Sequence, residues 1–159
     1  MDNCYQFSAI RGTQAHRAFY VAMLPYGSVA KVLGAAATTN PKRGRPVNKA
    51  RIPALAAYLQ SATDGHCVPP IHVMVDGVMR FETADFSRSV GKLFLEVSAT
   101  LDVIDGGHRI AAISKALVDR PGLARETLPV CFYAAAGAVA AQEMFETINE
   151  KAIRPARSK

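Results

Sequence analysis

The residue types best suited to chemistry occur together in one short stretch, Asp105, Gly106, Gly107, His108 and Arg109. This stretch follows an apolar run and precedes a helical pattern. Two glycines at such a junction let a ligand approach the first backbone N–H groups of the helix, where the helix dipole is positive. Arg109 can donate two parallel hydrogen bonds to phosphate oxygens, and His108 can donate a hydrogen bond or transfer a proton. The stretch therefore predicts an anion site with phosphate as its ligand.

Asp105 is compatible with three roles: helix cap, metal ligand, or acceptor for a ribose hydroxyl. The same residues also fit an ordinary Asp-Gly-Gly turn in which Asp105 is the N-cap. The stretch is not a Walker loop, because the Gly-Lys-Ser/Thr ending is missing, and it is not a Gly-x-Gly-x-x-Gly motif. Spacing alone leaves the phosphate site and the capped turn as alternatives.

Basic charge is concentrated at the two ends of the chain, whose net charge is +6. Residues 1–60 hold eight Lys/Arg and one acid, residues 61–150 hold seven Lys/Arg and twelve acids, and residues 151–159 add four basic groups. The densest basic run comprises Lys42, Arg43, Arg45, Lys49 and Arg51. Such a run indicates contact with the phosphates of DNA, RNA or a nucleotide. Its alternative is a solvated loop.

Composition and cysteine usage exclude several classes of protein. The chain has 159 residues, of which 50% are apolar, so it suits one domain with a real core. No apolar run approaches the roughly 20 residues that cross a bilayer, and no signal peptide is visible. The three cysteines, Cys4, Cys67 and Cys131, are odd in number and far apart in the chain. This pattern argues against a disulfide framework and indicates that the protein is located in the reducing cytoplasm. Cys131 is predicted to be a small core residue. We expect no metal site from His66, Cys67 and His72, because zinc needs four converging ligands.

The predicted elements belong to the α/β or α+β class, with one mixed sheet and flanking helices. Predicted strands are Tyr5–Ile10, Arg17–Leu24 (separated from the first by Gly12), Lys92–Val97, Leu101–Ile104 and Leu128–Tyr133, with a hairpin of Ile71–Val75 and Val78–Phe81 around an Asp76-Gly77 turn. Predicted helices are Val29–Leu33 capped by Ser28, Lys49–Gln60 capped by Asn48, His108–Leu117, and Ala138–Asn149 with an apolar stripe of Met144, Phe145 and Ile148. Thr38–Val47 is predicted to be an exposed loop.

Three segments in order resemble one known family. The chemical stretch is similar to the Asp-Gly-Gln-His-Arg motif that names the DGQHR domain. Upstream lies Arg45-Pro-Val-Asn48-x-x-Arg51-Ile, and downstream lies Gln142-x-Met-Phe-x-x-Ile-Asn149. Together they resemble the DndB family, which is encoded with the DNA phosphorothioation (sulfur modification) machinery. The resemblance covers nearly the whole chain.

The resemblance implies a DNA-binding regulator that represses the modification operon, in a domain distantly similar to the ParB and sulfiredoxin fold. Residues 105–109 would form a phosphate cradle, for which a nucleoside triphosphate with Mg²⁺ is a candidate ligand. Gln142 and Asn149 would face that nucleotide, and Arg45, Asn48 and Arg51 would touch phosphate. The family glutamine is Gly107 here, so an amide that could position water is missing. Family members run longer, so the resemblance implies one of two alternatives: a fragment that lacks a C-terminal part, or a minimal form without a DNA-binding or dimerising half. In both, residues 1–150 form a single domain and residues 151–159 a basic tail.

Three functions compete. The first is a DNA-associated regulator that the basic segments 42–51 and 151–159 steer to DNA, with modification proteins as further partners and a homo-oligomer as a further possibility. The second is a ParB-like nucleoside triphosphatase in which Arg109 stabilises phosphate charge and His108 or Asp105 organises water. The third is an interaction module that binds no small ligand. The sequence favours the first, because the charge segregation agrees with the family resemblance and no complete catalytic set is visible.

Overall fold

The computed structural model of the chain describes residues 3–39, 47–61, 65–135, 143–144 and 146–147. Its elements in chain order are β1 (Cys4–Gln14), β2 (Arg17–Pro25), α1 (Tyr26–Thr39), the 3-10 turn η1 (Lys49–Arg51), α2 (Ile52–Ser61), β3 (Ile71–Asp76), β4 (Met79–Thr83), β5 (Val90–Glu96), β6 (Thr100–Asp105), α3 (Gly107–Asp119), the 3-10 turn η2 (Pro121–Arg125) and β7 (Thr127–Ala134). In the described part, the strands form one seven-stranded sheet in the order β4-β5-β1-β2-β7-β3-β6. The β3–β7 pair is parallel and the other pairs are antiparallel, so the predicted mixed sheet with flanking helices is confirmed.

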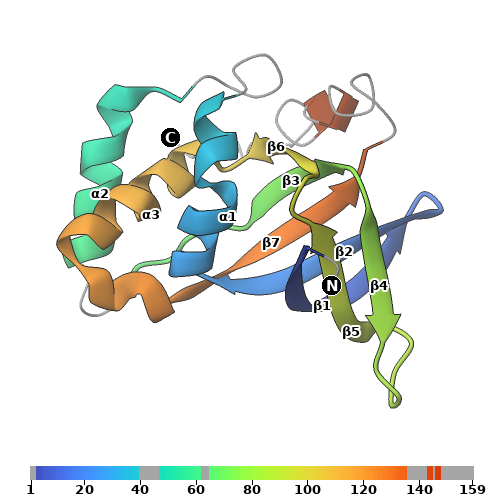
Figure 1. Cartoon of the computed structure of the whole chain (residues 1–159). Coiled ribbons are helices and arrows are strands. Elements are labelled where there is room, and N and C mark those ends of the chain that lie inside the picture. The colour runs from blue at the N-terminus through green and yellow to red at the C-terminus, as the bar shows by residue number, and fades with distance from the viewer. Residues whose placement is uncertain (1–2, 40–46, 62–64, 136–142, 145, 148–159) are drawn as a thin grey trace, which may run out of the picture.

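The predicted hairpin around Asp76 and Gly77 is wrong. Strand β3 pairs with β6 and β7, whereas β4 pairs with β5. Gly77 has a φ of +148°, and a Cβ there would lie 2.6 Å from the Cβ of Ala99 in the β5–β6 connection. Strands β3 and β4 together form one side of a long two-stranded ribbon, and β5 and β6 form the other side. The glycine bends this ribbon, and the chain reverses at residues 84–89 instead. Because this ribbon joins opposite ends of the strand order, the sheet has to curl (Figure 1).

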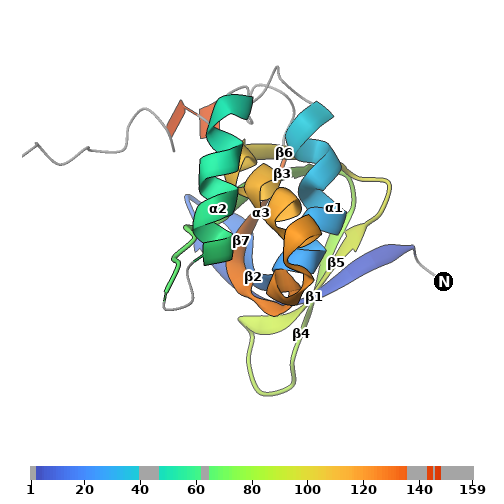
Figure 2. The ribbon, with the colours of Figure 1, turned by 90° about the vertical axis from the view of Figure 1, so that its left-hand side faces the viewer.

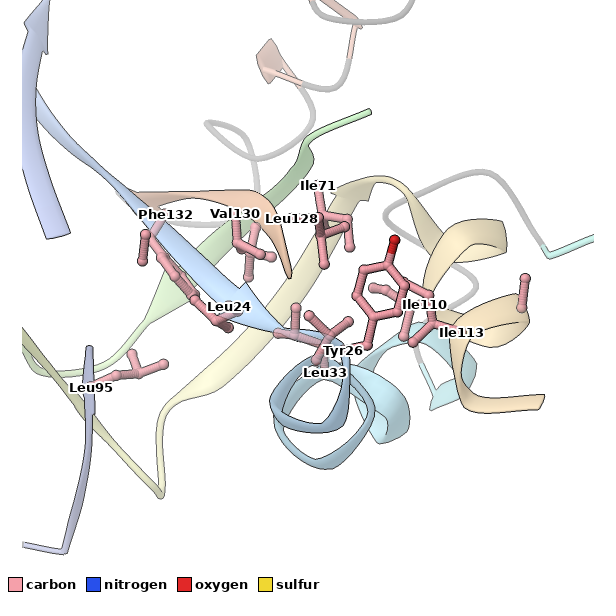
Figure 3. Packing of buried hydrophobic residues seen from close by; sticks show 14 of the residues in the cluster. Leu24, Tyr26, Leu33, Ile71, Leu95, Ile110, Ile113, Leu128, Val130 and Phe132 are labelled. Atoms are coloured by element: carbon pink, nitrogen blue, oxygen red, sulfur yellow. The ribbon is translucent and has the colours of Figure 1, made fainter. Parts of the chain in front are cut away.

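Helices α1, α2 and α3 lie together on one side of the sheet, with α3 between α1 and α2 (Figure 2). Alternate residues of the central strands face them, and Val130 and Phe132 of β7 are fully buried in a cluster that also contains Leu33, Ile110 and Ile113 of the helices. Within this cluster, Phe132 lies beside Leu24 of β2 (Figure 3). Burial of each such side chain contributes about 1.5–3 kcal/mol before the cost of ordering the chain.

We call the face of the sheet opposite the helices the outer face. By the alternation of β7, Cys131 and Tyr133 lie on this outer face. Cys131 is half-buried there, so its prediction as a small core residue is wrong.

Long-range contacts override two local signals. Helix α1 begins at Tyr26, whose backbone N–H donates to the Glu126 carbonyl at 2.7 Å, so Ser28 lies inside the helix rather than capping it. The helix then continues past Leu33 to Thr39 through three alanines, which are strong helix formers. Strand β1 passes straight through Gly12, which does not separate two strands there.

The predicted helix starting after Asn48 is confirmed. The Asn48 side chain accepts a hydrogen bond from the Ala50 backbone N–H at 3.0 Å, a 3-10 turn follows, and Pro53 lies in the first turn of α2. Of the predicted helix 138–149, only residues 143–144 and 146–147 are described, and they are helical. There Met144 packs on Met74 and Ile104 on the outer face of the sheet, while Phe145 and Ile148 lie outside the described residues.

Candidate functional site

The candidate site is built where β6 ends and α3 begins. Gly106 occupies the N-cap position with a φ of +108°, a left-handed conformation that favours glycine. A Cβ at this position would lie 2.9 Å from Cγ1 of the fully buried Ile71. The helix therefore has no side-chain cap, and the interpretation of Asp105 as the N-cap residue is wrong, because Gly106 occupies that position. The backbone N–H groups that begin α3 therefore follow a residue without a side chain.

Asp105 is instead paired with Arg109, one helical turn later. An Nη2 hydrogen of Arg109 is donated to Oδ2 of Asp105 at 3.0 Å, and Nη1 donates to the Pro70 carbonyl at 2.8 Å. The Arg109 side chain is only 18% exposed. Arg109 thus fastens the start of α3 to the segment that leads into β3, and part of its guanidinium is already used within the protein.

His108 connects the site to the upstream basic segment. Its Nε2 accepts a hydrogen bond from the Asn48 backbone N–H at 2.8 Å, across 60 residues of sequence. An accepting Nε2 requires the tautomer with its proton on Nδ1. Beside it, a Cβ on Gly107 would lie 3.2 Å from Cγ2 of Val47, so the glycine lets Val47 lie close.

The predicted site residues divide into two groups. Those brought together are Asn48, Gly106, Gly107, His108 and Arg109, with Asp105 behind them; Lys49 and Arg51 are exposed in the 3-10 turn that Asn48 starts. The starts of α2 and α3 consequently lie at the same end of the molecule (Figure 1). The predicted residues outside the described part of the chain are Lys42, Arg43, Arg45, Gln142 and Asn149.

A comparison with protein families identifies what this chain is related to. A family model described as DndB, DNA-sulfur modification-associated, matches residues 7–159. The chain belongs to the DndB family. Searches of curated proteins and of solved structures find no match.

Membership of the DndB family confirms the resemblance drawn from the three motifs and connects the chain to DNA sulfur modification. It does not by itself assign a ligand to the β6–α3 junction. In the described part of the chain, no helix is long and apolar enough to cross a membrane.

A polar group that the sequence analysis did not bring together lies next to this junction and consists of His72, Cys131 and Tyr133. His72 lies opposite both Asp105 and Cys131 in the sheet register. Its Nδ1 is hydrogen-bonded to the Tyr133 hydroxyl at 3.0 Å, and the two rings are stacked. Burial raises the pKa of Tyr133 to about 12, with the neighbouring Cys131 adding to the effect. A period-two pattern in β3 and β7 could have placed these residues on one face, but not in contact.

The other candidate ligands of a metal lie in a segment that is hydrogen-bonded to two tyrosines. His66 Nε2 is hydrogen-bonded to the Tyr26 hydroxyl at 2.8 Å, and the Cys67 backbone N–H donates to the Tyr58 hydroxyl at 2.9 Å. These bonds hold the segment before β3 against α1 and α2. Among the residues that the structure describes, no three His, Cys, Asp or Glu side chains gather into a metal site.

The protonation of His72 gives the fold a pH dependence. Burial lowers the pKa of His72 below 6.5; the Asp105 carboxylate opposes this shift and the Arg109 guanidinium adds to it. Because the unfolded chain takes up this proton first, stability is full above the unfolded pKa and falls as the pH drops from about 7.5 to about 5.5. Urea unfolding at the two pH values should show a smaller loss in His72→Gln than in the wild type.

The matched control is His16→Asn, because His16 is exposed and its φ of +63° suits asparagine. This variant should keep the wild-type pH dependence. An unchanged pH dependence in His72→Gln would contradict the assignment to His72.

Proposed function

We propose that this chain is a DNA-binding regulator of DNA phosphorothioate modification, with a DNA phosphate held at residues 105–109. The single observation that carries the proposal is the hydrogen bond from the Asn48 backbone to His108, because it brings the basic segment to the glycine-started helix. Family membership supplies the biological context of DNA sulfur modification.

The described residues support a phosphate contact through backbone and charge together. The start of α3 offers N–H groups and a positive dipole, and Gly106 has no side chain that would compete for them. Lys49 and Arg51 add two exposed positive charges at the adjoining 3-10 turn. In this proposal, Lys42, Arg43 and Arg45 continue the same contact along the DNA, and Gln142 and Asn149 reach it from the downstream segment.

In this proposal, the main role of His108 and Arg109 is to hold the start of α3 and the basic segment in place. They are not the only groups that bind the phosphate. His108 Nε2 is engaged by Asn48, and Arg109 holds Asp105 and the Pro70 carbonyl. A nucleoside triphosphatase would need a group that orients water. Gly107 supplies none, and the other two candidates, His108 Nε2 and Asp105 Oδ2, already accept hydrogen bonds from Asn48 and Arg109. These contacts favour binding over hydrolysis as the function.

The salt dependence of DNA binding tests the proposal. Removing one positive charge that touches a phosphate should reduce the slope of log K against log[salt] by about 0.9 for duplex DNA. Lys49→Gln combined with Arg51→Gln should therefore lower the slope by about two and weaken binding at low salt. Fluorescence anisotropy with a duplex from the promoter of the modification operon, between about 50 and 200 mM salt, measures both quantities.

The matched control removes two exposed positive charges elsewhere, Arg88→Gln with Lys92→Gln on the β4–β5 hairpin. This pair should leave the slope within about half a unit of the wild type. Equal effects of the two pairs would show a diffuse charge effect and contradict the assigned site. Thermal melting with ATP, CTP or GTP and Mg²⁺ tests the competing ligand, since a nucleotide at about 100 times its Kd adds about 2.7 kcal/mol.

A further inference from the structure

A hollow of about 270 Å³ lies on the outer face of the sheet, beside the turn that joins β1 to β2. Its walls include Phe19, Met74, Tyr133 and Met144, and Arg17 lies at its rim. This volume is close to the lower end of the range for small-molecule pockets, about 300–1,000 Å³, which suits one planar ring system. We propose that the hollow receives a single unstacked nucleobase of DNA. The proposal rests on the proposed function only in taking DNA as the ligand.

The walls have the chemistry that stacks on a base. The rings of Phe19 and Tyr133 are nearly parallel, with an interplanar angle of 18° and centroids 5.8 Å apart. Met74 is buried in the strand beside them, and Met144 approaches from a separate segment that packs on Met74. Aromatic rings are the usual stacking partners of splayed-out bases, and thioethers adapt to flat ring edges.

The two rings are held in place before any ligand arrives. Phe19 lies opposite Gly12, and a Cβ on Gly12 would be 2.6 Å from the Phe19 Cζ, so the ring covers the glycine. Tyr133 is fixed by the bond from its hydroxyl to His72. Side chains that are already ordered lose little entropy when a ligand binds, which favours recognition at this position.

The rim carries polar groups suited to a nucleotide. Arg17 is exposed and offers a guanidinium for the phosphate next to the base, while Gln14 offers an amide for a base edge. Between them, Ala15 and His16 have φ values of +48° and +63°, in a two-residue turn that usually contains Asn-Gly. Such strained positions cost about 1–3 kcal/mol and concentrate at functional sites. None of the described lining residues is acidic.

The hollow and the β6–α3 junction are connected by the stacked rings. Tyr133 stacks on His72 with centroids 5.9 Å apart, and His72 is the register partner of Asp105. The route from β2 through β7 and β3 to β6 crosses three strand spacings, or roughly 14 Å. One single strand of DNA can therefore place a base in the hollow and a phosphate further along the same strand at the junction.

The test compares strands with and without bases. The full chain is titrated by fluorescence anisotropy with a labelled strand of about 12 thymidines and with an abasic strand of the same length and charge. The wild type should prefer the thymidine strand at least tenfold, and Phe19→Leu should reduce the preference to below about threefold, because leucine keeps the apolar volume without a stacking face. The control is Phe86→Leu, an aromatic residue 82% exposed on the loop after β4, which should keep the preference.

Each remaining outcome decides the proposal. Equal binding of the two strands, or a preference that survives in Phe19→Leu, overturns the base pocket but leaves phosphate binding at the junction standing. Binding of neither strand, with duplex binding intact, overturns it as well; absence of binding to every DNA would remove the proposed function too. Displacement of the strand by thymidine monophosphate near the Kd of the strand would assign the pocket to a free nucleotide instead.

A second measurement does not depend on the folding of a variant. A strand carrying 5-iodouracil, irradiated on the wild-type protein, should form a crosslink to Phe19 or Tyr133. Mass spectrometry of the peptides locates the crosslink. Crosslinks found only at residues that do not line the hollow would overturn the assignment.

Discussion

Gly106→Ala is expected to lower the free energy of unfolding by about 3 kcal/mol, because two costs add at this position. A side chain at a φ of +108° and a ψ of 12° brings backbone strain of about 1–3 kcal/mol. The new Cβ would also lie 2.9 Å from Ile71, which is fully buried and has little room to move, at a further cost of about 1–3 kcal/mol. Urea unfolding of the wild type and the variant measures the difference.

Gly107→Ala is the control for this prediction. Gly107 is the first residue of α3, its φ is not positive, and the nearest atom to its Cβ is Val47 Cγ2 at 3.2 Å. Val47 is only half-buried and can shift, so this variant should cost less than about 1 kcal/mol. Equal losses in the two variants would contradict the left-handed cap at Gly106. A DNA-binding defect in Gly107→Ala without loss of stability would instead indicate that the contact between Val47 and α3 positions the basic segment.

The elements that position the site could be read from the sequence because their signals are local. Ile110, Ile113 and Ala116 recur at helical spacing, and all three are buried on the inward side of α3. The Asn48 cap was equally readable, since its side chain bonds a backbone group only two residues away. Such signals are reliable because they depend only on residues within one or two helical turns of each other.

The predicted hairpin failed for a reason that is not local. The φ of Gly77 is positive, but it serves a bend and not a chain reversal. The choice between the two depends on whether β4 finds β3 or β5 as its partner, and that is decided by strands far away in the sequence. The same limit applies to Tyr26, which starts α1 through a carbonyl 100 residues later.

The chemistry of the site was only partly predictable. The sequence placed a glycine-started helix and a basic segment, but the bond between Asn48 and His108 spans 60 residues and has no periodic signal. The acceptors of Arg109 include the Pro70 carbonyl, and a backbone carbonyl leaves no trace in sequence because every residue carries one. The contact between His72 and Tyr133 was missed because it too joins residues far apart in the chain. Side-chain types identify what chemistry is available, whereas long-range packing decides which groups are already engaged.

Arg109→Ala is expected to destabilise the ligand-free protein by about 2–3 kcal/mol. The guanidinium makes bonds of 3.0 Å to Asp105 and 2.8 Å to the Pro70 carbonyl from a side chain that is 18% exposed, and hydrogen bonds to charged groups contribute about 1.5–3 kcal/mol. Urea unfolding measures the destabilisation. Arg109→Lys should recover part of it, since an ammonium can reach one acceptor but cannot fork between two.

The size of this destabilisation decides how DNA-binding data on Arg109 are to be read. Arg88→Ala, which removes an exposed guanidinium from the loop before β5, should cost less than about 0.5 kcal/mol. If Arg109→Ala is as mild as Arg88→Ala, the bonds to Asp105 and Pro70 contribute little, and Arg109 is free to turn toward a phosphate. If it is destabilising as expected, any fall in DNA affinity reflects a loosened junction as well as a missing charge. Lys49 and Arg51, which are exposed, then provide the cleaner measure of phosphate contact.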